Sequence, residues 1–272
     1  MNYRHIYHAG NFADIFKHFI VFLIMQRLQE KPAGFMALDA FAGIGLYNLK
    51  ASEAQKTAEY KTGIEPFTGA EFRNLTLKKF QEFLLPEWES GFYAGSPVQM
   101  RAQIRTQDRL YLNELHKDDF KSLSQSMAFY KNVFLSNIDA YHAVKAQIPP
   151  SEKRGFVLLD PPFEKRNEFE LLIKNMELWQ KKFPMGHYAL WYPIKANDMS
   201  LELNTKAKEL AIHRSYRLEI LRHKRETKDQ LNGCGMLLLN APYTVVELLS
   251  AAKDELEVAL KGQIEIELLT TD

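Results

Sequence analysis

The chain has 272 residues, of which 46% are hydrophobic and 25% are charged. This composition is typical of a globular protein and excludes the disordered and fibrous classes. Because 35 lysines and arginines nearly balance 34 aspartates and glutamates, any nucleic-acid partner must be held by a local basic patch rather than by the net charge.

The first element expected is a helix that begins at Asn11. An asparagine side chain can cap the first free amides, and Asp14 lies near the positive end of the helix dipole. Apolar side chains then recur at helical spacing, at positions 15, 16, 19, 20 and 23. The longest apolar run, residues 19–25, is far shorter than the ~20 residues that span a membrane. We therefore expect this helix to pack on a sheet and expect no membrane association.

Short apolar runs rich in branched and aromatic residues alternate with amphipathic stretches along the chain. This alternation predicts the α/β class, with a seven-stranded, mostly parallel sheet and helices on both faces. The strands are expected at residues 35–39, 109–114, 133–136, 156–160, 188–192, 217–221 and 236–240.

The pattern changes between residues 48 and 92. Polar helical segments such as residues 71–83 are broken by glycines and prolines there, and no convincing strand is present. The segment is too long for an ordinary connection between a strand and its helix. We therefore expect a helical insertion subdomain at 48–92, with residues 1–47 and 93–272 forming the main domain.

A glycine-containing turn follows the first predicted strand. Asp39 ends that strand, and the turn 40–45 contains Phe41, Gly43 and Gly45. The small residues of this turn let a ligand approach the backbone closely. Asn48 stands where the third glycine of a dinucleotide fingerprint would fall. The turn therefore favours a cofactor without a pyrophosphate over a nicotinamide, although an ordinary tight turn also fits it.

A second motif, Asp160-Pro161-Pro162-Phe163, follows the apolar strand at 156–160. Two prolines stiffen the backbone, so that the Asp160 carboxylate and the Pro161 carbonyl can be held toward one point. Such an acceptor pair suits an adenine N6 amine, because it draws the lone pair out of conjugation and aims it at an electrophilic methyl group. Phe163 then offers a stacking face for the base. A plain proline turn is the alternative.

The segment 240–243, Asn-Ala-Pro-Tyr, resembles a degraded copy of this motif. We interpret it as structural, because the last strand of such a sheet usually lies away from the ligand crevice.

These motifs resemble those of the class I amino-methyltransferases, and nearly the whole chain resembles the RlmJ family of bacterial 23S rRNA adenine-N6 methyltransferases. The segments that carry the resemblance are Tyr3-Arg4-His5, residues 8–18, Gly95-Ser96-Pro97, residues 113–116, Asp139, Arg154-Gly155, Trp191-Tyr192-Pro193 and residues 233–236. The resemblance implies a Rossmann-like methyltransferase fold. It also implies methyl transfer from S-adenosyl-L-methionine (SAM) to the N6 amine of an adenosine in 23S rRNA. We expect the chain to act as a monomer.

The resemblance further implies the catalytic corner Asp160, Pro161, Pro162 and Phe163. Together with the glycine-containing turn, which contributes Asp39, Phe41 and Gly43, it implies a cofactor site that also contains His18, Ser96, Glu114, Asp139, Ala140 and Asp160. In that site His18 and Ser96 would hold the methionine part, Glu114 the ribose hydroxyls, and Asp139 with Ala140 the adenine ring. Helix caps and surface charges are the alternative roles for the acidic residues. Family members carry a histidine where this chain has Phe41, so cofactor packing should differ there.

Several residues are candidates for contact with RNA. Lys17, Lys165 and Arg166 should border the cleft and guide phosphates toward it. Tyr3 and Arg4 could stack on or pair with RNA, although a mobile tail would also explain them. The basic run at 222–228 is interpreted as a solvated loop, and the insertion at 48–92 is expected to lie over the active site and help to grip RNA.

No metal is expected, because His5, His8 and His18 have no cysteine or carboxylate cluster to complete a site. The single cysteine, Cys234, is consistent with a reducing cytoplasm. Other functions stay open: a DNA adenine or protein glutamine methyltransferase would use the same corner, a silent RNA-binding or cofactor-sensing protein would not need Asp160, and a nicotinamide oxidoreductase is disfavoured by the missing glycine.

Overall fold

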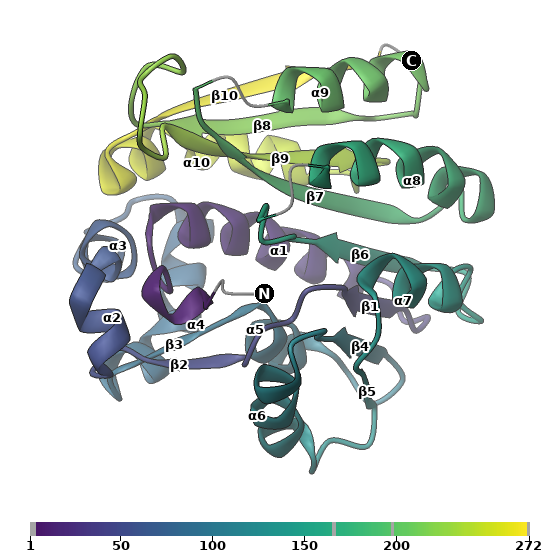
Figure 1. Cartoon of the computed structure of the whole chain (residues 1–272), viewed down its shortest axis with the longest axis horizontal. Helices are drawn as coiled ribbons and strands as arrows, with labels where there is room; N and C mark the ends of the chain where they lie inside the picture. Colours follow the sequence, from purple (N-terminus) through teal and green to yellow (C-terminus); the bar gives the residue numbers. More distant parts are fainter. Residues whose placement is uncertain (1–3, 165–166, 197–198, 271–272) are drawn as a thin grey trace.

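The computed structural model describes residues 4–164, 167–196 and 199–270, and a large central sheet organises it (Figure 1). The strands, in spatial order, are β10 (Gln263–Leu268), β8 (Tyr216–Leu221), β9 (Gly233–Leu239), β7 (His187–Ile194), β6 (Gly155–Leu159), β1 (Met36–Asp39), β4 (Arg109–Asn113) and β5 (Val133–Ser136). The five strands from β7 to β5 run parallel, whereas β9 runs antiparallel to β7 and β8, and β10 antiparallel to β8. The α/β class and the mostly parallel sheet are confirmed.

The sheet has eight strands rather than the seven expected. The additional strand is β10, whose sequence alternates isoleucine with glutamate and whose Ile264 is buried. That alternation is typical of a strand, but its glutamates disfavour one and the segment was not predicted as a strand. Arg217 on the neighbouring strand explains why they are tolerated, because its guanidinium lies 3.3 Å from Glu265 and 2.9 Å from Glu267.

Helices cover both faces of the sheet. One face carries α1 (Phe12–Gln29), α5 (Ser96–Gln103) and α10 (Val245–Leu260), and the other carries α7 (Ala140–Gln147), α8 (Glu168–Lys182) and α9 (Ser200–Glu209). A further helix, α6 (Lys117–Met127), joins β4 to β5. Side chains alternate along β6. Phe156 and Leu158 pack on the face that carries α1, and Val157 and Leu159 pack on the face that carries α8. This two-residue period is that of a strand buried on both faces.

The opening helix forms as its sequence predicts. Asn11 caps α1 by accepting a hydrogen bond from the Asp14 backbone amide at 2.9 Å. Most of α1 is buried, because the sheet lies on one side and α10 and residues 48–92 on the other. No helix within the described ranges is both long and apolar enough to cross a membrane.

Residues 48–92 lie beside α1 (Figure 1). They contain α2 (Ser52–Thr57), the short 3-10 helix η2 (Glu59–Thr62), α3 (Ile64–Thr68) and α4 (Leu75–Glu89), and they are bounded by the antiparallel pair β2 (Leu46–Asn48) and β3 (Phe92–Ala94). The pair β2–β3 was not expected from the sequence. Phe80 on α4 packs on Phe19 and Phe22 at ring distances of 5.4 and 5.3 Å. The apolar side chains of this segment therefore share the core of α1.

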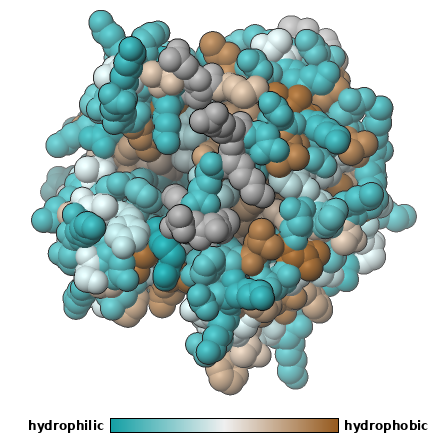
Figure 2. Space-filling view, in the orientation of Figure 1, coloured by the Kyte–Doolittle hydropathy of each residue, from teal (hydrophilic) through white to brown (hydrophobic). Residues whose placement is uncertain are grey.

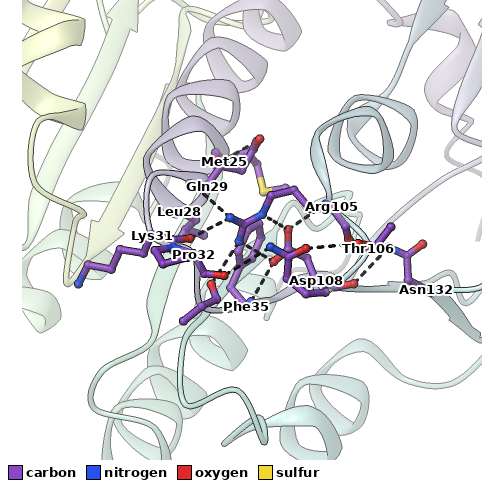
Figure 3. Close-up of polar contacts among 12 residues, drawn as sticks. Met25, Leu28, Gln29, Lys31, Pro32, Phe35, Arg105, Thr106, Asp108 and Asn132 are labelled. Carbon is purple, nitrogen blue, oxygen red and sulfur yellow. Dashed lines mark hydrogen bonds and ion pairs between the residues drawn. The ribbon is translucent and has the colours of Figure 1, made fainter.

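A polar clasp ties the end of α1 to the sheet (Figure 3). Arg105 binds the fully buried Asp108 through two hydrogen bonds of 2.8 and 2.9 Å, and donates to the carbonyls of Gln29 and Lys31 at 3.0 and 2.8 Å. Asp108 also accepts from the Phe35 amide at 3.2 Å. The clasp thus fixes the path by which the chain leaves α1 and enters β1.

Candidate active site

A cleft of about 1220 Å³ opens at the carboxyl ends of the parallel strands, where open α/β sheets bind their ligands. Residues that follow β1, β4, β6 and β7 line it, together with the first two turns of α1, the start of α7 and the loop between β8 and β9. Hydrophilic side chains cover most of the molecular face that Figure 2 shows. Of the expected site residues, His18, Phe41, Gly43, Ser96, Glu114, Asp139, Ala140 and Asp160 to Phe163 line the cleft.

The turn after β1 has the close backbone approach that its glycines predict. Gly43 has a φ of +61°, and a Cβ atom there would lie 2.3 Å from the Tyr47 hydroxyl. Its amide donates to Glu114 at 2.8 Å, and Glu114 also accepts from the His116 amide at 2.6 Å. Burial raises the pKa of Glu114. Each carboxylate oxygen thus keeps a lone pair for a ligand hydroxyl after it has fixed the turn.

Asp39 lies behind the turn and is not among the residues that line the cleft, so its expected contact with the cofactor stays a prediction. It is fully buried, and its Oδ1 accepts from the Phe41 amide at 3.2 Å. Burial raises the pKa of Asp39 to about 7, against the opposing effect of hydrogen bonds from Ser96 and Phe41. Asp39 therefore shapes the turn from inside and sits near the midpoint of its titration at neutral pH.

His18 presents one ring nitrogen without a partner. Its Nδ1 accepts from the Gln99 amide at 3.0 Å and lies 2.5 Å from the Tyr93 hydroxyl, so the proton of the neutral ring lies on Nε2. Nε2 is buried and makes no hydrogen bond within the described residues. Burial lowers the pKa of His18 well below its usual value. At this wall of the cleft a neutral N–H donor is available for an acceptor on a ligand.

The corner that follows β6 is tied to α1 by an ion pair. Lys17 Nζ lies 2.5 Å from Asp160 Oδ2 and 2.9 Å from Asp14 Oδ1. Burial alone would lower the pKa of Lys17, but the two carboxylates outweigh it and hold the pKa well above its usual value. His5 lies 2.9 Å from the other oxygen of Asp14. A chain of polar contacts therefore runs from His5 to Asp160.

Lys17 lines the cleft as expected, although it is only 3% exposed and pairs with two carboxylates. Its role in guiding phosphates stays a prediction. Arg4 lies 3.9 Å from Asp119, with its side chain about half exposed, and does not line the cleft. Tyr3, Lys165 and Arg166, the other predicted RNA contacts, lie outside the described residues.

Aromatic side chains form a wall beside Asp160. Phe163 lies 4.7 Å from Phe169 and 5.9 Å from Trp191, measured between ring centroids. Its φ is +50°, an uncommon conformation for a residue with a side chain. Lys17 Nζ lies 5.9 Å from the Trp191 ring. No role was expected for Trp191, and only its place in the Trp-Tyr-Pro segment of the family resemblance could have indicated one.

Asp139 caps α7 by accepting from the Tyr141 and His142 amides, both at 3.1 Å through Oδ1. The alternative cap role is therefore realised, and Asp139 lines the cleft as well. The segment 240–243 lies at the opposite edge of the sheet, because antiparallel pairing places Leu239 beside Tyr188 at the start of β7. Its distance from the cleft follows from the direction of β9 and not from a peripheral position, since β9 lies between β8 and β7.

Residues 48–92 also reach the cleft, through Glu59 and Thr62. Glu59 accepts from Asn11 at 2.9 Å and lies 2.8 Å from His8 Nδ1. A Cβ atom at Gly63 would lie 2.2 Å from the Asn11 backbone. Residues 59–63 are thus packed tightly against the segment that enters α1.

Comparison with known proteins shows which family the chain belongs to. Residues 32–267 match the family model described as Ribosomal RNA large subunit methyltransferase D, RlmJ. The chain belongs to the RlmJ family. It is therefore an enzyme of a family of ribosomal RNA methyltransferases.

Relatives of this RlmJ-family chain match over nearly their full length. Proteins named Ribosomal RNA large subunit methyltransferase J from Haemophilus influenzae and Escherichia coli are 33% and 30% identical to it. The matches cover 90% and 89% of this chain, and 89% and 88% of those proteins. A crystal structure of a Legionella pneumophila protein, 28% identical, superimposes with a TM-score of 0.87 and covers 96% of this chain and 98% of that one.

Proposed function

We propose that this RlmJ-family enzyme transfers a methyl group from SAM to the N6 amine of an adenosine in 23S rRNA, acting as a monomer in the cytoplasm. The observation that carries the proposal is the Asp160 carboxylate, which Lys17 holds at 2.5 Å between an aromatic wall and the glycine turn. The names of the Haemophilus and Escherichia relatives support the large-subunit RNA as substrate.

The residues of the cleft fit this cofactor. The Nε2–H of His18 can donate to the carboxylate of the methionine part, beside Ser96. Glu114 can accept the ribose hydroxyls, and the absence of a side chain at Gly43 leaves the backbone accessible. Asp139, with Ala140, can face the adenine ring. The cofactor supplies a methyl group on a positively charged sulfur, which leaves as a neutral thioether.

Asp160 and Pro161 would then orient the target amine. Lys17 occupies Oδ2 of Asp160, which leaves Oδ1 to accept one amine hydrogen while the Pro161 carbonyl accepts the other. Both contacts favour a pyramidal nitrogen whose lone pair faces the methyl group. The nitrogen gains positive charge as the new N–C bond forms. A fixed carboxylate stabilises this charge and can take up the proton that leaves.

Phe163 and Trp191, whose rings are tilted by 59° to each other, provide apolar ring faces for the base beside Asp160. Stacking on an aromatic side chain contributes about 1–3 kcal/mol per base. Because an adenine within a helix cannot enter such a cleft, the target must lie in a loop or be flipped out of its stack. Selectivity for adenine then rests on the two acceptors that meet its amine.

The decisive test is Asp160→Ala, assayed with labelled SAM on 23S rRNA from a strain that lacks the endogenous modification, followed by mapping of N6-methyladenine. We expect methyl transfer to fall by about 10³-fold, far more than the affinity for SAM. Asp254→Ala, an exposed position on α10, is the matched control and should have full activity. Full activity of Asp160→Ala, or methylation of DNA or of a glutamine-containing peptide in preference to rRNA, would refute the proposal.

A further inference from the structure

Apart from the buried Lys17, the lysines and arginines that line the cleft gather toward one end of the sheet. At the end formed by β4 and β5 the charged lining residues are Glu114, Asp119 and Asp139. Further carboxylates line other parts of the cleft, at Asp14, Glu59, Glu164, Glu168 and Asp229. The cations lie toward the other end: Lys195 follows β7, and Arg222 and Lys228 belong to the loop between β8 and β9. Asp160 follows β6, between the two groups. The acidic end suits a cationic methyl donor, and the basic end suits a polyanion.

Residues 222–232, here named the β8–β9 loop, have a defined internal structure. Asn232 is fully buried, and its side-chain amide donates to the carbonyls of Arg225 and Thr227 at 2.8 and 2.7 Å. Its backbone carbonyl accepts from the Arg222 and His223 amides at 2.9 and 3.1 Å. The base of the loop is thereby closed, so its side chains are presented from a fixed frame.

Three basic side chains of this loop fall into two kinds, one that is ion-paired and two that have no ion pair within the described part of the protein. Arg225 pairs with the fully buried Glu219, which also accepts from the Tyr192 hydroxyl at 2.8 Å. Neither Arg222 nor Lys228 has an ion pair within the described ranges of the chain. Arg222 lies over the Phe12 ring at 4.9 Å. Arg225 therefore anchors the loop, while Arg222 and Lys228 keep their charge for a partner.

We propose that the β8–β9 loop binds the phosphates that flank the target nucleotide, with Arg222 and Lys228 as the contacting residues. The chemistry of the partner, a single-stranded or splayed RNA, rests on the proposed function. The loop contains four lysines and arginines against two acidic residues, whereas residues 48–92 contain six against seven. Charge therefore favours this loop over the insertion as the surface that holds RNA, which reverses our interpretation of the basic run as a solvated loop.

The test compares two double variants in their binding to a short fluorescein-labelled single-stranded RNA across a series of KCl concentrations. Loss of two phosphate contacts should lower the slope of log K against log salt by about 1.4, at about 0.7 per phosphate for a single strand. We expect this decrease for Arg222→Gln/Lys228→Gln. The control, Lys78→Gln/Lys79→Gln, removes two exposed cations from α4 and should keep the wild-type slope. An unchanged slope for the first variant, or a decrease for the control alone, would overturn the proposal.

Kinetics on 23S rRNA separates this inference from the proposed function. The loop variant should raise KM for RNA by about tenfold or more at physiological salt, because each phosphate contact contributes to binding but not to the chemical step. Its kcat and its affinity for SAM should stay unchanged, and Arg222→Lys/Lys228→Arg should restore KM. Wild-type enzyme that binds the RNA probe with the expected slope but methylates no rRNA would refute the proposed function alone. A loop variant with a lower kcat and an unchanged KM would refute the role of the loop alone.

Discussion

The ammonium group of Lys17 lies 2.5 Å from Oδ2 of Asp160, although 143 positions separate the two residues in the chain. The contact joins the second turn of α1 to the corner after β6, and Asp14 supports it from the other side at 2.9 Å. One buried cation thus balances two carboxylates, and its removal should affect both folding and catalysis.

Lys17→Met should leave Asp14 and Asp160 without their shared cation. Breaking a buried pair in this way costs about 3–5 kcal/mol of folding stability, and methyl transfer should fall by about 100-fold or more because Asp160 loses its orientation. Urea unfolding and single-turnover methylation measure the two effects. Lys17→Arg keeps the charge and should lose less stability than Lys17→Met; equal losses would show that charge is not what matters here.

Gly43→Ala should weaken SAM binding, because a Cβ atom would lie 2.3 Å from the Tyr47 hydroxyl in a backbone with φ of +61°. Strain of this kind costs about 1–3 kcal/mol, which corresponds to about 5- to 150-fold in affinity. The double variant Gly43→Ala/Tyr47→Phe removes the clashing oxygen and should recover part of the loss. Isothermal titration with SAM gives the affinities, and the absence of any recovery would place the cost in the backbone alone.

Asp39 should make the stability of the cofactor-free enzyme depend on pH. Its pKa is about 7 in the folded protein against an ordinary value of 3.8, so its protonated form stabilises the fold at low pH, and this contribution is lost as pH rises from about 4 to about 7. Asp39→Asn should therefore be more stable relative to wild type at pH 8 than at pH 5, by about 2–3 kcal/mol. Urea unfolding of both proteins at these two pH values measures the difference, and a constant difference would contradict the assignment.

The clasp around Arg105 and Asp108 should be a main determinant of stability remote from the cleft. Asp108→Asn leaves the guanidinium with a neutral partner at a fully buried site, and we expect a loss of about 3 kcal/mol. Arg27→Gln, at a partly exposed ion pair with Glu30, should cost no more than about 1 kcal/mol. Denaturant unfolding compares them, and SAM affinity should not change in either variant.

Phe163 allows stacking to be separated from backbone strain. Phe163→Ala and Phe163→Gly both remove the ring and should lower kcat/KM for RNA by about 10- to 100-fold, as expected for the loss of about 1–3 kcal/mol of stacking. At a φ of +50°, glycine should give a folding stability about 1 kcal/mol above that of alanine. Phe163→Tyr keeps a flat ring and serves as the control with near wild-type activity. A large activity difference between the glycine and alanine variants would mean that the backbone, not the ring, limits the reaction.

Much of the fold was predictable because it rests on local signals. The Asn11 cap, the apolar period of α1 and the buried strand before Asp160 can each be read from neighbouring residues. The glycine-containing turn after β1 and the Pro-Pro corner after β6 are also local signals, and both correctly indicated which edge of the sheet carries the cleft. β10 was missed because its glutamates are neutralised by Arg217, which lies more than forty positions away in sequence.

The roles of individual charges were harder to predict, because burial depends on contacts between distant segments. Lys17 is followed by a histidine and a long apolar run, and nothing in that run shows that its ammonium faces Asp160. Asp39 ends a strand as a ligand-binding acid would, yet the turn folds over it. Arg222 and Lys228 lie in an ordinary basic run, and only the direction of β9 brings that run to the cleft.

The antiparallel direction of β9 places the β8–β9 loop on a hairpin that can vary separately from the residues of the methyl-transfer site. Because β9 runs antiparallel to β7, the chain returns to the ligand-binding edge after the parallel strands have ended there. It does so in a hairpin whose tip carries Arg222 and Lys228. A hairpin tip can change in length and charge without disturbing the strands that carry it. Recognition of a different RNA could therefore arise in residues 222–232 while the transfer chemistry stays intact.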